Sequence, residues 1–178
     1  MRRIVIIGAT GSGKSTLGKM LAEKSGCHYT DLDEIHWLPG WKERPREEFR
    51  RLIDEATRGS VWIVAGNYTP HAKEIVWPRA DALIWLDMPF WPNFWRIFIR
   101  TLARIRDGET VCNGNRETLR QSFFSRRSIL WWFIKSHGEK RKKYAAVFAR
   151  PQDYPHLEMI RLRAYADIAA CIESIACE

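Results

Sequence analysis

The sequence contains no CxxC pair and no apolar run long enough to cross a membrane. Its four cysteines are scattered, which excludes a zinc knuckle and a disulfide scaffold: Cys27, Cys112, Cys171 and Cys177. The apolar run Ile4–Ile7 is too short for the core of a signal peptide. No stretch approaches the ~20 apolar residues that span a bilayer. We therefore expect a soluble, cytoplasmic protein that has no membrane partner.

Repeats, low-complexity stretches and Pro/Ser-rich linkers are also missing, so we expect residues 1–178 to form a single domain. With 46% hydrophobic and 28% charged residues, the composition is that of a globular protein and excludes a disordered tail or a fibrous repeat. What the sequence has in excess is positive charge, a net +8, and tryptophan, nine in all.

The charge excess lies in one segment. Residues 91–150 contain 14 Lys+Arg and 4 Asp+Glu, a net of +10, while the remainder sums to −2. Ten of the 22 aromatic residues also fall between Phe90 and Phe133. A basic, aromatic-rich segment favours phosphate-bearing partners, and composition leaves open whether these are nucleic acids or nucleotides.

Hydrophobic patterning predicts an alternation of strands and helices. We expect strands over Arg3–Ile7, His28–Leu32, Val61–Ala65, Ala82–Leu86 and His156–Arg161. We expect helices over Lys14–Ser25, from Pro45 to Gly59, Pro92–Arg106, Arg116–Phe124, Ser128–Tyr144 and Ala164–Ile175. This alternation indicates an α/β domain with a parallel sheet wound on both faces.

The clearest motif is Gly8-Ala9-Thr10-Gly11-Ser12-Gly13-Lys14-Ser15, a complete G-x-x-x-x-G-K-[ST] match between an apolar strand and an amphipathic helix. The glycines let successive N–H groups turn inward toward phosphate oxygens, and the helix adds the positive end of its dipole. Lys14 is expected to reach the β- and γ-phosphates of ATP, and the Ser15 hydroxyl to ligate Mg²⁺. The expected nucleotide contacts are Gly8, Ala9, Thr10, Gly11, Ser12, Gly13, Lys14, Ser15 and Thr16.

A phosphate loop of this kind also needs an acidic residue for Mg²⁺, usually at the end of a nearby strand. Asp87 closes the run Ala82–Leu86 and is the predicted metal ligand, although an acidic helix cap before Pro92 is an alternative. Asp31 and Asp33 end the second strand and share one face of an extended chain. Of this pair, we expect Asp33 to accept a proton from a substrate hydroxyl or to hold a magnesium-bound water.

Two groups of side chains frame the proposed acceptor site. Trp37 and Trp41 flank Pro39-Gly40 and are candidate ligand contacts. Arginines recur every four residues along the helix after the fourth strand, at Arg96, Arg100 and Arg104. Such arginines can offset the charge that spreads over a transferred phosphoryl group. The lysines at 140–143 fit a solvated helix face better.

Taken in order, these motifs resemble those of the adenylate-kinase-like nucleotide kinases, and most closely the group called DNA topology-modulation proteins. The resemblance is carried by the phosphate loop together with the stretches Leu32–Trp41, Trp62–Tyr68, Ala80–Pro89 and Asn113–Glu117. It covers most of the chain. It implies a three-layer P-loop NTPase fold whose five parallel strands run in the order 2-3-1-4-5.

The resemblance also implies a helical acceptor-binding insert at 34–59 and a mobile basic lid at about 107–150. By the same likeness, Arg100 and Arg116 are expected to stabilise charge in catalysis, and the turn Gly66-Asn67-Tyr68 to contact the acceptor. One departure is informative. Adenylate kinases carry an arginine in the turn after the third strand that grips the acceptor phosphate, and Gly66–Pro70 has none. The acceptor is therefore expected to differ from AMP.

The leading hypothesis is a Mg-ATP-dependent phosphotransferase that moves the γ-phosphoryl group to a small-molecule acceptor. An ATP-dependent nucleic-acid-binding protein is the alternative favoured by the +10 segment. A small ATPase switch without an acceptor is a third possibility, for which the sequence offers no clear water-positioning residue.

Overall fold

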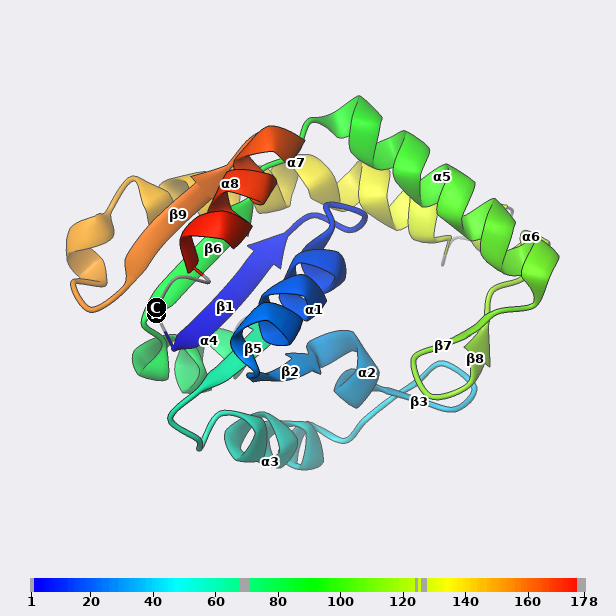
Figure 1. The fold of residues 1–178 in the computed structure, drawn as a ribbon. Coiled ribbons are helices and arrows are strands. Elements are labelled where there is room, and N and C mark those ends of the chain that lie inside the picture. The colour runs from blue at the N-terminus through cyan, green and yellow to red at the C-terminus, as the bar shows by residue number, and fades with distance from the viewer. Residues whose placement is uncertain (1, 68–70, 124, 126–127, 176–178) are drawn as a thin grey trace.

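A five-stranded parallel sheet forms the centre of the molecule (Figure 1). The computed structural model describes residues 2–67, 71–123, 125 and 128–175. The strands are β1 (Arg3–Gly8), β2 (His28–Asp31), β5 (Trp62–Ala65), β6 (Ala82–Leu86) and β9 (Glu158–Leu162). They are ordered β2-β5-β1-β6-β9. When the five strands of this sheet are numbered 1 to 5 along the chain, their order in the sheet is 2-3-1-4-5. The predicted strand order is therefore confirmed.

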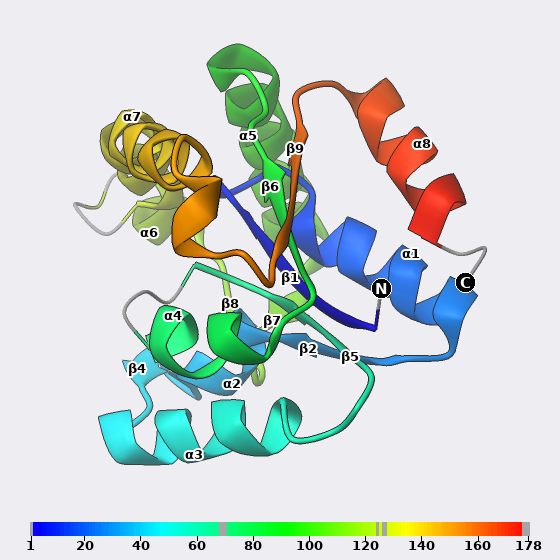
Figure 2. The same ribbon diagram turned by 90° about the vertical axis from the view of Figure 1, so that its left-hand side faces the viewer.

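Helices cover both faces of the sheet, as the alternation of strands and helices predicts (Figure 2). Ile4 and Ile6 of β1 point to the face covered by α1 (Lys14–Ser25) and α8 (Tyr165–Ile175). Val5 and Ile7 point to the opposite face, because successive side chains of a strand alternate. That face packs against α3 (Arg46–Ala56), α4 (His71–Ile75) and α7 (Ile129–Phe148). The three-layer arrangement is thus confirmed.

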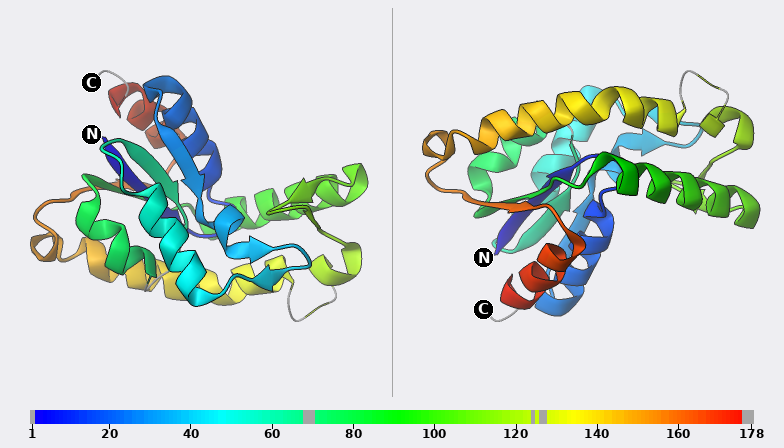
Figure 3. Two further views of the ribbon diagram at one scale, coloured as in Figure 1. Left: turned by 90° about the horizontal axis from the view of Figure 1, so that it is seen from below. Right: turned by 90° about the horizontal axis from the view of Figure 1, so that it is seen from above.

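Helices α5 (Phe90–Asp107), α6 (Leu119–Phe123) and α7 extend beyond the sheet, with α5 and α7 side by side (Figure 3). They share a small core in which Ile97 and Phe133 are fully buried and Phe90, Phe94 and Phe123 pack around them. Five phenylalanines of this region therefore hold these helices together, whereas four tryptophans of the same region are exposed: Trp91, Trp95, Trp131 and Trp132. Among the described residues, no helix has both the length and the apolar character needed to cross a bilayer.

Two short hairpins depart from the predicted elements. Trp37–Leu38 (β3) pairs with Lys42–Glu43 (β4), and Thr110–Val111 (β7) pairs with Asn115–Arg116 (β8). The predicted helix over 116–124 is therefore wrong at its start: Arg116 is on a strand, and only α6 is helical.

The second strand also ends one residue earlier than predicted. The Asp31 carboxylate accepts the backbone N–H of Asp33 and so caps α2 (Leu32–His36), which the sequence did not predict. Single-turn 3₁₀ helices cover Trp77–Arg79 (η1) and Pro151–Asp153 (η2).

Candidate active site

The phosphate loop lies between β1 and α1, where the sequence predicts it. Gly11 and Gly13 have φ of 76° and 98°, left-handed values that glycine adopts without strain. A Cβ on Gly11 would lie 2.4 Å from Cγ1 of Ile97, so α5 packs directly on the loop. The Lys14 ammonium bridges back across the loop, donating to the carbonyl oxygens of Gly8 at 3.1 Å and Ala9 at 3.0 Å. Residues 8–16 thus form one continuous loop and first helical turn.

The Ser15 hydroxyl bonds to Asp31. Its Oγ donates to Oδ2 of Asp31 at 2.6 Å, and the Tyr29 hydroxyl donates to the same oxygen at 3.1 Å. The other oxygen accepts the Asp33 N–H at 3.0 Å. Burial and the Asp31 charge raise the pKa of Tyr29 above its ordinary value, so the phenol stays protonated as a donor. A hydroxyl and a carboxylate held together are oxygen donors of the kind that Mg²⁺ prefers, with the substrate phosphates completing its shell.

Asp87, the predicted partner of Ser15, has other partners. Its side chain is 2% exposed, and its oxygens accept from Nε of Arg141 at 2.9 Å and from Nη2 of Arg161 at 2.6 Å. Arg163 approaches the same carboxylate at 3.9 Å. The structure therefore joins Asp31, not Asp87, to Ser15, because the arginines of α7 and β9 occupy the Asp87 carboxylate. Asp87 fixes α7 to the sheet edge.

Asp33 lies in the first turn of α2 at the carboxyl end of β2, among cations. Burial lowers the pKa of Lys14, while the carboxylates of Asp33 and Asp31 oppose that shift and the charge of Arg100 adds to it. Lys14, Asp33 and Arg100 are thus close enough to influence one another's charge. The structure brings together these three sequence-predicted residues from the phosphate loop, α2 and α5.

Arg100 is a half-buried cation facing this group. Burial lowers its pKa, the neighbouring Arg104 lowers it further, and Glu117 and Asp33 oppose the shift. Its buried Nε has no hydrogen-bond partner among the described residues. Arg104, one turn later, is ion-paired to Glu117 at 3.3 Å. Of these two arginines, Arg100 has the donor capacity for an anionic ligand.

Lys140 also faces the site, against the expectation of a solvated helix face. Together with Ala9 of the phosphate loop and Tyr144, it lines a small cavity between α7 and the end of the sheet. Burial and the Lys14 charge lower its pKa to about 8, and Asp33 opposes the shift. Its ammonium lies 5.2 Å from the Trp132 ring centroid. Sequence reasoning missed it because a lysine within a Lys/Arg run carries no sign of which way it points.

The turn after β5 supports the phosphate loop. The Asn67 side chain accepts the Gly8 N–H at 3.1 Å and donates to the Gly8 carbonyl at 2.6 Å, and the Tyr144 hydroxyl donates to its Oδ1 at 2.9 Å. A Cβ on Gly66 would lie 2.6 Å from Cβ of Leu32, so only glycine fits there. Tyr68 lies outside the described residues. Asn67 is therefore hydrogen-bonded to both backbone groups of Gly8, the first residue of the phosphate loop.

Trp37 and Trp41 lie on the hairpin that follows α2, with their rings edge-to-face at 5.8 Å. The Trp41 indole N–H donates to the carbonyl of Arg116 at 3.4 Å. The Arg116 side chain is exposed on β8. The two tryptophans and Arg116 are thus close together, on opposite sides of a contact between two hairpins.

On the other side of the loop, Arg96 stacks on Tyr165, with 4.9 Å between its guanidinium carbon and the ring centroid. A Cβ on Gly13 would lie 3.7 Å from this guanidinium, so the stacked pair borders the phosphate loop. Tyr165 could not be singled out from the sequence, because its position beside Arg96 depends on the pairing of β9 with β6.

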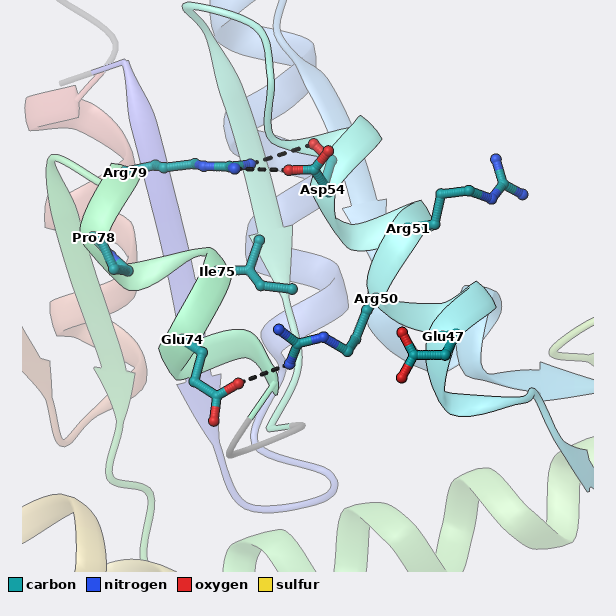
Figure 4. Close-up of a pocket in the computed structure, with 8 residues that line it drawn as sticks. All are labelled: Glu47, Arg50, Arg51, Asp54, Glu74, Ile75, Pro78 and Arg79. Atoms are coloured by element: carbon teal, nitrogen blue, oxygen red, sulfur yellow. Dashed lines mark hydrogen bonds and ion pairs between the residues drawn. The ribbon is translucent and has the colours of Figure 1, made fainter.

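A groove of about 450 Å³ lies elsewhere, between α3 and the segment 74–79 (Figure 4). Its charged side chains are largely paired: Arg50 with Glu74 and Arg79 with Asp54, each at 2.7 Å. None of the phosphate-loop residues lines it. This groove is therefore separate from the site around Lys14.

Comparison with known proteins points to small-molecule kinases. The family model for shikimate kinase matches residues 10–44, which contain most of the phosphate loop, Asp31 and Asp33. A shikimate kinase of Persephonella marina is 29% identical over 143 residues, covering 72% of this chain and 84% of the relative. A gluconokinase of Arabidopsis thaliana is 35% identical, covering 30% of this chain and 38% of the relative. The structure of Acinetobacter baumannii shikimate kinase in complex with shikimate has a TM-score of 0.58 and 16% identity, covering 98% and 90%.

These matches support the P-loop kinase part of the resemblance drawn from the sequence. They do not support its narrower part, the DNA topology-modulation group, or the nucleic-acid-binding alternative. Fold, phosphate loop and relatives together identify an ATP-dependent P-loop kinase that acts on a small molecule.

Proposed function

We propose that the protein transfers the γ-phosphoryl group of Mg-ATP to a hydroxyl group of a small hydroxylated carboxylic acid. The observation that carries the proposal is the grouping of three cations, Lys14, Arg100 and Lys140, around the carboxylate of Asp33. Shikimate and gluconate, the acceptors in the names of the relatives, are both acids of this class. The missing arginine after β5 also disfavours AMP as the acceptor.

In this proposal the phosphate loop binds the nucleotide. Its inward N–H groups and Lys14 bind the β- and γ-phosphates, and Ser15 and Asp31 are the proposed magnesium ligands in place of Ser15 and Asp87. When bound, Mg²⁺ offsets the negative charge that develops on the phosphate oxygens. Arg96 and Tyr165, stacked beside Gly13, are the proposed contacts for the nucleotide base.

The acceptor end is assigned to the groups on the other side of Lys14. Asp33 accepts the proton of the acceptor hydroxyl as that oxygen attacks the γ-phosphorus. Arg100 stabilises charge on the transferring group, as its buried Nε favours, since it has no hydrogen-bond partner in the part of the chain that the structure describes. Lys140 binds the acceptor carboxylate, and Arg116 with Trp37 and Trp41 closes the open end of the site.

An ADP-release assay with Mg-ATP tests the proposal. The panel contains hydroxylated carboxylic acids, their uncharged carboxamides and nucleoside monophosphates. We expect turnover stimulated by at least one acid, little stimulation by its carboxamide, and loss of turnover in Lys14→Ala. Stimulation by a nucleoside monophosphate alone, or by no hydroxy acid in a panel that includes shikimate and gluconate, would contradict the proposed acceptor class.

A further inference from the structure

Two segments that are distant in sequence are joined next to the C-terminal end of α2. The hairpin β7–β8, in the basic segment, lies beside the hairpin β3–β4 of the 34–59 insert (Figures 1 and 3). Asn115, only 3% exposed, makes two hydrogen bonds across the contact. Its Nδ2 donates to the carbonyls of Leu38 at 3.1 Å and Cys112 at 2.5 Å, and its Oδ1 accepts the Trp41 N–H at 2.8 Å. One buried amide thus satisfies backbone groups of both hairpins.

Asn113 extends the contact to the helix that carries Asp33. Its Nδ2 donates to the carbonyl of Glu34 at 2.7 Å and to that of Trp37 at 2.6 Å. Both carbonyls lie at the C-terminal end of α2, where helix carbonyls lack partners within the helix. A side chain from the basic segment therefore completes the hydrogen bonding of α2 and fixes its end.

The turn of the β7–β8 hairpin has an unusual backbone conformation. Cys112, Asn113 and Gly114 have φ of 43°, 63° and 79°, three left-handed residues in succession. Such a run is costly for residues other than glycine and persists only where the surroundings determine it. The hairpin also lies near the catalytic carboxylates. Burial, followed by the charges of Asp33 and Asp31, raises the pKa of Cys112 to about 12.

We propose that Asn113 and Asn115 are positioning residues that latch the β7–β8 hairpin onto the acceptor insert. The latch couples the motions of α2, the β3–β4 hairpin and β8, which together form one side of the acceptor site. It thereby holds Asp33 toward the acceptor and keeps bulk water away from the γ-phosphate. The inference rests on the proposed function for its kinetic consequences, whereas the physical contact can be measured without any substrate.

The test uses Asn115→Ala, Asn113→Gly and the control Thr110→Ala, an exposed β7 residue. Glycine at 113 retains the left-handed conformation and removes only the side-chain amide. Hydrogen–deuterium exchange of the substrate-free protein follows the peptide that contains the Trp41 amide. We expect exchange there to quicken about tenfold in Asn115→Ala, which removes the acceptor of that N–H, and to stay at the wild-type rate in Thr110→Ala.

Steady-state kinetics then test the positioning role. We expect both asparagine variants to raise the acceptor KM about tenfold and to increase acceptor-independent ATP hydrolysis, with the ATP KM within twofold of wild type. Unchanged exchange at Trp41 in Asn115→Ala would overturn the latch. Quickened exchange with unchanged acceptor KM and hydrolysis would overturn its role in the reaction. If wild-type protein phosphorylates no acceptor, the proposed function fails, and the exchange experiment still decides whether the latch exists.

Discussion

At the scale of single residues, three aspartates at the carboxyl ends of β2 and β6 have different surroundings. Asp31 is hydrogen-bonded to Ser15 and Tyr29, Asp33 lies among the cations of the site, and Asp87 is buried against arginines. The sequence predicts that acidic residues lie at the ends of strands. It does not show which of their carboxylates forms an ion pair with an arginine from a distant part of the chain. The structure therefore moves the proposed magnesium ligand from Asp87 to Asp31.

The first residue-scale prediction concerns Asp33 as the base. Asp33→Asn keeps the size and removes the proton acceptor, so we expect kcat to fall by about 10²–10⁴-fold with ATP affinity within about twofold. Steady-state kinetics with a titration of a non-hydrolysable ATP analogue provide both values. A kcat within threefold of wild type would show that Asp33 is not the base.

The second residue-scale prediction distinguishes Asp31 from Asp87 as the magnesium ligand. In Asp31→Asn we expect the Mg²⁺ concentration for half-maximal activity to rise about tenfold, because a charged metal ligand is lost. In Asp87→Asn we expect an unchanged Mg²⁺ requirement and a free energy of unfolding lower by about 2 kcal/mol, because Arg161 and Arg141 lose their counter-charge. Mg²⁺ titration and urea unfolding measure these quantities. The reverse pattern would return the metal site to Asp87.

The third concerns Lys140 and pH. Its pKa is lowered from 10.5 to about 8, so the ammonium is charged below that pH and loses its charge as pH rises through about 8. We expect kcat/KM for an acid acceptor to fall about tenfold between pH 7 and pH 9. Lys140→Arg keeps the charge throughout this range and should flatten the decline. An equal decline in both proteins would assign the titration to another group.

At the scale of elements, the strongly patterned parts of the chain were predictable. The apolar strands, the phosphate loop and helix α1 depend on contiguous residues, and the structure confirms them. The hairpins β3–β4 and β7–β8 were missed, because two-residue strands show no periodicity and the stretch 116–124 has helix-compatible residues. Their pairing depends on Asn113 and Asn115 contacts with a distant segment. The same limit explains why Lys140 and Tyr165 were not found.

The element-scale prediction concerns the start of α7, which carries Lys140 and Arg141. The Ser128 hydroxyl accepts the Trp131 N–H at 3.3 Å and donates to the Ser122 carbonyl, so it caps α7 and ties it to α6. Ser128→Ala is expected to lower the free energy of unfolding by about 1–2 kcal/mol. Urea unfolding followed by circular dichroism measures the loss. Ser174→Ala, in the exposed C-terminal part of α8, is the control and should change stability by less than about 0.5 kcal/mol.

At the scale of the whole molecule, three cations of the basic segment border the phosphate loop or interact with Asp33: Arg96, Arg100 and Lys140. Arg96 stacks on Tyr165, Arg104 pairs with Glu117, and Arg141 pairs with Asp87. Of the arginines predicted to form a stripe, Arg96 and Arg104 have partners and Arg100 interacts with Asp33, and this arrangement suits a small phosphorylated ligand better than a polymer. Composition alone favoured phosphate-bearing partners, and the fold shows which of the cations lie near the phosphate loop.

The most direct test of the account is mass analysis of the acceptor after incubation with Mg-ATP and the enzyme. We predict that a hydroxylated carboxylic acid gains one phosphoryl group for each ADP formed, and that Lys14→Ala and Asp33→Asn form little or none of this product. Release of ADP at an acceptor-independent rate, with no phosphorylated acceptor from any acid tested, would contradict the assignment of the site to phosphoryl transfer.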